Sequence, residues 1–144
     1  MTEIVVPKDW CSKAHQCWLN EDKGQCIKLT VDALNKHGRI KPKGLYEQIA
    51  YYLYLSDDFK SAAMFTEQGL VQYPNDRQMS SNLVSIYSQL KRHQDAIDTA
   101  DKLIASRGED ANLLDALCSS LYQSKQYQRA ATIGTQSLLF KDKT

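Results

Sequence analysis

Apolar residues recur along most of the chain at the spacing of an α-helix. Leu83, Ile86, Tyr87 and Leu90 lie at positions i, i+3, i+4 and i+7, on one helical face. The stretches are separated by short polar loops, so we expect neighbouring helices to be antiparallel. The predicted helices after residue 43 are Leu45–Leu55, Lys60–Gln72, Gln78–Leu90, Gln94–Ser106, Asn112–Ser124 and Gln128–Phe140.

The same pattern returns with a fixed period. Ala62, Ala96 and Ala130 are each 34 residues apart, and the residues around them align without gaps. A period of about 34 residues indicates an array of helix–turn–helix repeats, in which each repeat buries its apolar face against its neighbours. We therefore predict three regular repeats, 43–76, 77–110 and 111–144.

This pattern resembles the tetratricopeptide repeat (TPR) over at least residues 43–144. That family places a small residue on the first helix of each repeat and an alanine on the second. A further position that is usually small holds Gly69 and Ser137 in the first and third repeats but Leu103 in the second. The resemblance implies an all-α fold, a right-handed superhelix (α-solenoid) of antiparallel helix pairs. The matching positions are Ala50, Val84 and Cys118 on the first helices, and Ala62, Ala96 and Ala130 on the second.

A divergent fourth repeat is predicted before the regular ones. Pro7–Leu19 and Gln25–Lys36 read as its two helices, with Ala14, Cys17 and Cys26 at small or buried positions. The link to the next repeat would then be about two residues longer than the family standard. We predict one TPR domain over residues 1–144, with the divergent repeat at 7–42.

Composition excludes several classes of partner. The 18 Lys and Arg residues nearly balance the 17 Asp and Glu residues, giving a net charge of +1. This balance gives no electrostatic basis for binding nucleic acid or an anionic membrane, and we expect neither partner. No apolar run is long enough to span a bilayer and the N-terminus does not resemble a signal peptide, so we expect a cytoplasmic protein with reduced cysteines.

The resemblance also implies a binding surface. In the family the first helices line a concave groove, and here the corresponding side chains are mostly neutral amides, hydroxyls and aromatic rings. Such groups suit hydrogen bonding to a peptide backbone with aromatic anchors, although they could equally be solvated residues on an open face. The predicted groove residues are Trp18, Glu47, Tyr51, Tyr54, Gln78, Ser81, Ser85, Gln89, Asn112, Asp115 and Tyr122.

Two more specific kinds of site are not favoured. The TPR domains that hold a C-terminal carboxylate use a clamp of Lys, Arg and Asn side chains, and only Asn82 agrees with it here, so we expect no strong capture of an acidic tail. Cys11 and His15 lie one helical turn apart, but the four-ligand spacing of a zinc site is absent. We expect no metal, no cofactor and, because no nucleophile or phosphate-loop motif is present, no catalysis.

The sequence therefore favours a protein–protein interaction scaffold that binds a peptide or helix in its groove. An alternative is the N-terminal regulatory or substrate-recruiting domain of a larger enzyme, such as a glycosyltransferase or methyltransferase. A homodimer is a third hypothesis, because a repeat array normally ends in a polar capping helix. The last predicted helix instead carries Ile133, Leu138, Leu139 and Phe140.

Overall fold

The computed structural model describes residues 10–142, apart from the side chains of Arg107 and Asp142. The chain forms two compact units divided after Pro74, and we call residues 10–74 unit 1 and residues 75–142 unit 2. All regular structure in the described residues is α-helical, in eight helices, so the predicted all-α fold class is confirmed. None of the helices in the described part of the chain is long and apolar enough to cross a membrane.

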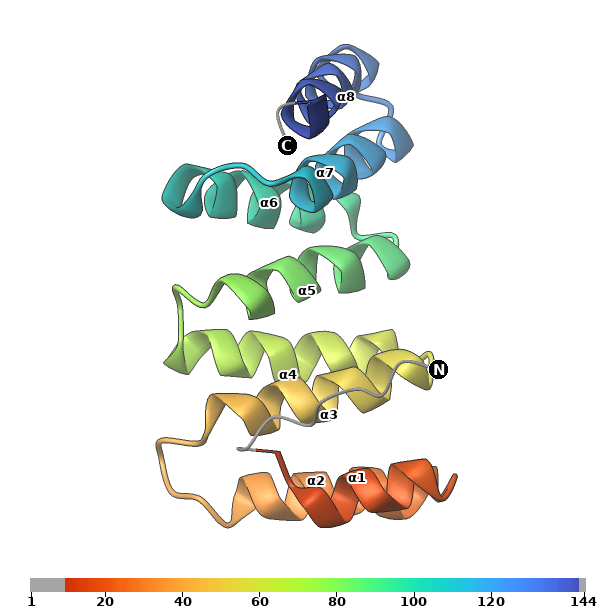
Figure 1. Cartoon of the computed structure of the whole chain (residues 1–144), viewed down its shortest axis with the longest axis vertical. Helices are drawn as coiled ribbons and strands as arrows, with labels where there is room; N and C mark the ends of the chain where they lie inside the picture. The colour runs from red at the N-terminus through yellow and green to blue at the C-terminus, as the bar shows by residue number, and fades with distance from the viewer. Residues whose placement is uncertain (1–9, 143–144) are drawn as a thin grey trace. The chain divides into compact units, whose positions relative to one another are not determined.

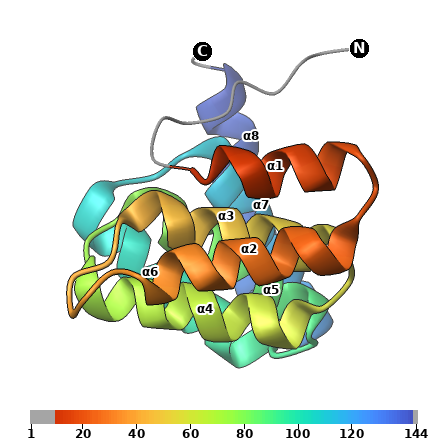
Figure 2. The same ribbon diagram turned by 90° about the horizontal axis from the view of Figure 1, so that it is seen from below.

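Unit 1 consists of two antiparallel helix pairs. Each helix packs against the next one in the chain, and the pairs can be followed from red to yellow-green in Figure 1 and from below in Figure 2. Ile49 and Leu53 of the third helix are buried because they lie four residues apart on one face. The helices are α1 (Ser12–Leu19), α2 (Lys23–Asn35), α3 (Lys43–Leu55) and α4 (Phe59–Gln72).

Unit 2 has the same order of two antiparallel pairs. Here too each helix packs against the next, and the first helices of the two pairs also touch each other. Leu83 and Leu117, which are one repeat period apart, are both buried. The helices are α5 (Arg77–Gln89), α6 (His93–Arg107), α7 (Ala111–Gln123) and α8 (Tyr127–Asp142).

The two helices of each pair are joined by the same tight turn. One residue in it has a left-handed backbone with φ between 63 and 67°, although none of the four is glycine. The following N–H donates to the carbonyl five residues earlier at 2.8–2.9 Å, which closes the helix as a Schellman motif and offsets a conformational cost of about 1–2 kcal/mol. The left-handed residues are Glu21, Asp57, Lys91 and Lys125.

The repeated alanines lie in the core. Ala62 and Ala96 are 0% exposed and Ala130 is 4% exposed. Leu103 is also buried, so the array accommodates the larger side chain at this position. Cys118 packs closely against α8: a Cβ added to Gly134 would lie 3.3 Å from its sulfur.

The predicted helix ends agree with the structure to within two residues, with one exception. The helix predicted from Pro7 begins at Ser12, and the prediction was wrong for Trp10 and Cys11, which are not helical. Cys11 is extended, with φ −76° and ψ 108°, because the Gln48 side chain binds both its N–H and its carbonyl group. Residues 7–9 lie outside the described part of the chain.

Candidate peptide-binding surface

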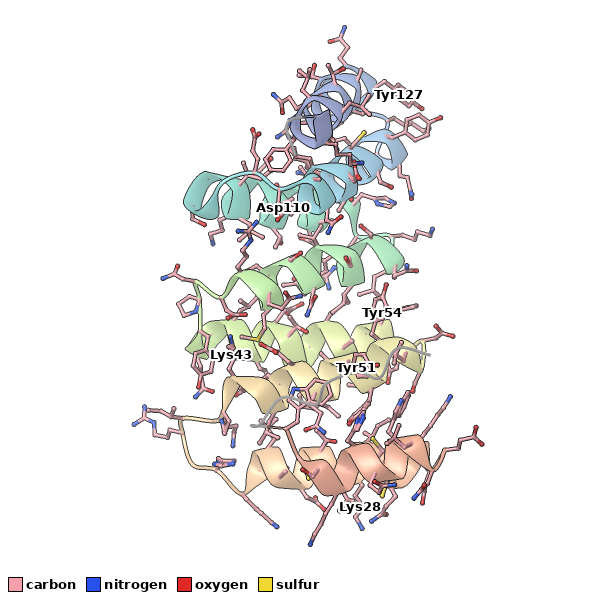
Figure 3. All side chains as sticks on the ribbon, viewed as in Figure 1. Lys28, Lys43, Tyr51, Tyr54, Asp110 and Tyr127 are labelled. Atoms are coloured by element: carbon pink, nitrogen blue, oxygen red, sulfur yellow. The ribbon has the colours of Figure 1, made fainter. Side chains whose placement is uncertain are left out.

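The predicted groove residues of unit 1 are half-buried and already packed. Trp18 of α1 stacks on Tyr52 with ring centroids 4.9 Å apart. Tyr51 lies against Trp10 at 5.6 Å, and Tyr54 meets Phe59 edge-on at 5.1 Å. Figure 3 labels Tyr51 and Tyr54 on α3. These aromatic rings therefore stabilise unit 1 as well as forming part of its surface.

The remaining predicted residue of unit 1 is Glu47. Its carboxylate lies 3.7 Å from the ammonium group of Lys43, one turn earlier on α3, and its side chain is 21% exposed. This is a surface ion pair of the i, i+4 type, which contributes a few tenths of a kcal/mol. Glu47 is thus the one charged member of the predicted set in unit 1.

A buried polar network centred on the Tyr52 hydroxyl joins α1 to α3. Gln48 Nε2 donates to this hydroxyl at 2.9 Å, and His15 Nδ1 lies 2.9 Å from it. Tyr52 and Gln48 are fully buried and His15 is nearly so. Burial raises the pKa of the Tyr52 hydroxyl above its ordinary range, despite the hydrogen bond from Gln48. The Tyr52 hydroxyl therefore stays protonated at neutral pH, and the network holds the short helix α1 in place.

The three cysteines of unit 1 gather around the same aromatic cluster. Cys26 is buried in it, and Cys11 and Cys17 pack against its edge. Burial raises the pKa of the Cys26 thiol to about 11, with a smaller contribution from the other two cysteines, so this thiol stays protonated at neutral pH. The described residues contain no group of three or more His, Cys, Asp and Glu side chains that could hold a metal ion.

In unit 2 the first helices, α5 and α7, are linked by two side-chain contacts, one exposed and one half-buried. Near their N-termini the Arg77 guanidinium donates to the Asp110 carboxylate at 2.5 Å. Farther along, the hydroxyls of Ser88 and Ser120 are 3.1 Å apart. Both contacts follow from the repeat, because residues about 34 positions apart occupy neighbouring places on adjacent first helices.

Asp110 also begins α7, at the position labelled in Figure 3. Its carboxylate accepts the Leu113 N–H at 2.8 Å, which is an N-cap hydrogen bond. Burial alone would raise the pKa of Asp110, but the hydrogen bonds from Arg77 and Leu113 outweigh it and hold the pKa below its ordinary value. Asp110 is therefore charged at neutral pH.

A surface pocket opens between the N-terminal parts of α5 and α7. Its volume is about 420 Å³, which lies at the lower end of the range for small-ligand pockets. Three predicted groove residues, two from α5 and one from α7, come together in its lining. The lining residues are Arg77, Gln78, Ser81, Asp110, Ala111 and Asn112.

The polar groups of this pocket are only partly satisfied. Gln78 Nε2 donates to Asn82 Oδ1 at 2.9 Å, which leaves the Gln78 carbonyl oxygen available. Within the part of the chain that the structure describes, the Ser81 hydroxyl and the Asn112 side-chain amide have no hydrogen-bond partner. The pocket thus offers both donors and acceptors from two helices.

The other predicted residues of unit 2 lie outside this pocket. Ser85 and Gln89 are exposed on α5. Asp115 accepts hydrogen bonds from Ser137 and Lys141 of α8, and these bonds lower the pKa of its carboxyl group. Tyr122 meets Tyr127 edge-on at 5.4 Å, and both rings are more than half exposed.

The sequence-based prediction missed Arg77 and Asp110. Neither residue was in the predicted groove set, because the family's groove positions begin at the second residue of each repeat. The available signal was a pair of opposite charges 33 residues apart, at the first position of one repeat and at its last position. With a period of 34 residues, such a pair lies at the same end of adjacent first helices.

Comparisons with known proteins bear on the fold. No family model matches the chain, and no curated protein matches it. Among solved structures, the MamA RS-1 ArsTM double mutant has a TM-score of 0.81 at 11% identity, covering 97% of this chain and 79% of that one. MamA 41-end from Desulfovibrio magneticus RS-1 has a TM-score of 0.79 at 14% identity, covering 97% and 80%.

A further crystal structure of MamA has a TM-score of 0.78 at 11% identity and covers 90% of this chain and 75% of that one. At such low identity the similarity establishes the fold alone. It agrees with the all-helical repeat fold that the 34-residue period predicts.

Proposed function

We propose that this chain is a protein-interaction scaffold that binds an extended peptide or a short helix on the first helices of its repeats, without catalysis of its own. The observation that carries the proposal is the unit 2 pocket. It brings Gln78, Ser81 and Asn112 from two helices to one place and leaves hydrogen-bonding groups of each available. Extended peptides are recognised through such main-chain hydrogen bonds, with side-chain pockets adding specificity.

Unit 1 supports the proposal in a different way. Its half-buried tyrosines offer partly exposed rings held in fixed positions by their neighbours. Rigid aromatic side chains of this kind are typical anchors at protein interfaces, because little conformational entropy is lost on binding. The proposed partner is therefore a protein or peptide, not nucleic acid or a membrane, and a cytoplasmic location is part of the same proposal.

Alternatively, the chain recruits substrates for a larger enzyme, and it would bind them on the same surface. This alternative differs in requiring a catalytic domain after the scaffold in the native protein, so the length of the native gene distinguishes the two.

A homodimer through α8 is a further hypothesis. Leu138 and Leu139 on that helix are 64% and 56% exposed, and light scattering over a range of concentrations tests whether they join two copies.

The binding proposal is tested by selecting ligands from a displayed library of random 12-residue peptides with the whole chain. We expect several binders, and Ser81→Arg should abolish their binding because the long side chain fills the pocket. Ala105→Arg is the matched control, since Ala105 is exposed on α6 and lies outside the pocket lining. Failure to select any binder, or equal binding by Ser81→Arg, would contradict the proposal.

A further inference from the structure

The two charged residues that line the unit 2 pocket form an ion pair with each other. Arg77 and Asp110 form one wall and pair at 2.5 Å, with side chains 49% and 31% exposed. An acidic ligand group that approaches Arg77 must also approach the Asp110 carboxylate. A basic group that approaches Asp110 must likewise approach the Arg77 guanidinium. The wall therefore gives a ligand group of either charge no net attraction to offset the loss of its hydration, and such unfavourable elements contribute to specificity alongside attractive ones.

The remaining groups of the pocket are those that a neutral amide would need. The Gln78 carbonyl oxygen is an acceptor, because its amide nitrogen already donates to Asn82. The Ser81 hydroxyl and the Asn112 amide can each donate and accept. A carboxamide offers one oxygen acceptor and two N–H donors, so it can bond to all three groups without carrying a charge into the pocket.

We propose that this pocket accepts the carboxamide side chain of an Asn or Gln residue in the bound peptide. The proposal rests on the peptide-binding function proposed above and adds the class of side chain that the pocket recognises. An uncharged donor–acceptor group fits the free groups of the pocket, and the paired wall gives its acidic and basic counterparts no net attraction.

The test uses a binder selected with the whole chain from the random 12-residue library. Each Asn or Gln of that peptide is changed in turn to the matching acid, to Lys and to Leu. We expect one position at which all three changes weaken binding about tenfold, which corresponds to the loss of one or two net hydrogen bonds. Fluorescence anisotropy of labelled peptides measures the dissociation constants.

Two variants of the protein then test whether the Arg77–Asp110 pair causes the weaker binding of the acidic and Lys peptides. Asp110→Asn keeps the N-cap of α7, because Asn is as good a cap as Asp, but leaves Arg77 without this carboxylate. It should restore binding of the acidic peptide by about tenfold and leave the Lys peptide weak. Arg77→Gln leaves Asp110 charged and should rescue the Lys peptide instead. Ala105→Glu, at an exposed position of α6 outside the pocket lining, is the control that should change none of these ratios.

The possible results separate the two proposals. If no peptide is selected, the peptide-binding function fails and this inference fails with it. If peptides bind but every Asn and Gln tolerates the change to acid and to Lys, only the inference is overturned. It is also overturned if such a position exists but neither Asp110→Asn nor Arg77→Gln changes which charged peptide binds. Thermal melting of both variants confirms that they are folded before binding is measured.

Discussion

Units 1 and 2 join their first helices by different kinds of polar contact. In unit 1, Tyr52 of α3 holds His15 of α1 through a buried hydrogen bond, and Gln48 binds the Cys11 backbone just before α1 through a half-buried one. In unit 2, Arg77 and Asp110 link α5 to α7 at the surface. Figure 1 shows that each unit consists of the same kind of helix pairs. The repeat thus fixes the positions of the helices but not the chemistry that joins them.

This difference means that the polar contacts of unit 1 mainly affect stability, whereas those of unit 2 mainly affect binding. A buried hydrogen bond is costly to break, because the partner left behind has lost its hydration without a replacement. Surface ion pairs contribute about 0–1 kcal/mol and remain accessible to a ligand. We therefore expect polar substitutions in unit 1 to lower the free energy of unfolding, and those in unit 2 to alter ligand binding.

The largest expected effect concerns the feature that both units share. Ala96→Arg should prevent unit 2 from folding, because Ala96 is 0% exposed and the change would bury an unpaired charge. Circular dichroism during thermal melting measures the loss of helix. Ala105→Arg, on the exposed face of the same helix, should melt like the unmodified chain. An unchanged melting curve for Ala96→Arg would show that the buried alanine does not define the helix contact.

Next in size is the buried network of unit 1. Tyr52→Phe removes the hydroxyl shared by His15 and Gln48 and should lower the free energy of unfolding by about 1–3 kcal/mol. Tyr54→Phe is the matched control, since the Tyr54 hydroxyl makes no hydrogen bond within the described residues. Urea denaturation compares the two variants. Equal loss in both would mean that the network contributes nothing beyond ring packing.

Much of the fold could be predicted from the sequence. The helical spacing of apolar residues and the 34-residue period placed nearly every helix end within two residues. The exception was the start of α1. Cys11 leaves the helical pattern because Gln48, 37 residues later, binds its backbone. A periodic pattern records contacts along one helix face, but it carries no information on a single side chain that binds a distant backbone.

The binding surface could be predicted only in part. The family register identified Gln78, Ser81 and Asn112, which the structure brings to one pocket. It did not predict that Trp18 would stack on Tyr52, because the aromatic residues of α1 and α3 can pack together or face solvent with the same spacing. Whether such a ring is packed or exposed depends on residues far away in the sequence, and their positions are known only from the folded structure.

A third prediction compares one contact in both units. Tyr54–Phe59 and Tyr122–Tyr127 occupy equivalent repeat positions and have nearly the same geometry, with centroids 5.1 and 5.4 Å apart. Tyr54→Ala should cost about 1 kcal/mol through the ring pair and the lost burial. Tyr122→Ala should cost less, because its ring is 64% exposed. A loss of several kcal/mol for Tyr54→Ala would place that residue in the core instead of on the binding surface.

The smallest expected effect is the pH dependence of unit 2. The pKa values of Asp110 and Asp115 are lowered in the folded state, so their contribution is complete above the unfolded value of about 4. It is lost as the pH falls through the lower folded values, and the total should stay below about 1 kcal/mol for each exposed pair.

The double variant Asp110→Asn, Asp115→Asn should therefore show a shallower fall in the free energy of unfolding between about pH 5 and pH 2. Urea titrations at several pH values measure this slope. Ser81→Ala is the control, because it changes an uncharged neighbour of Asp110 in the same pocket. If the slope of the double variant equals that of the unmodified chain, the surface carboxylates of unit 2 do not stabilise it. The contrast with unit 1 would then be sharper still, because these charges would remain only as determinants of ligand choice.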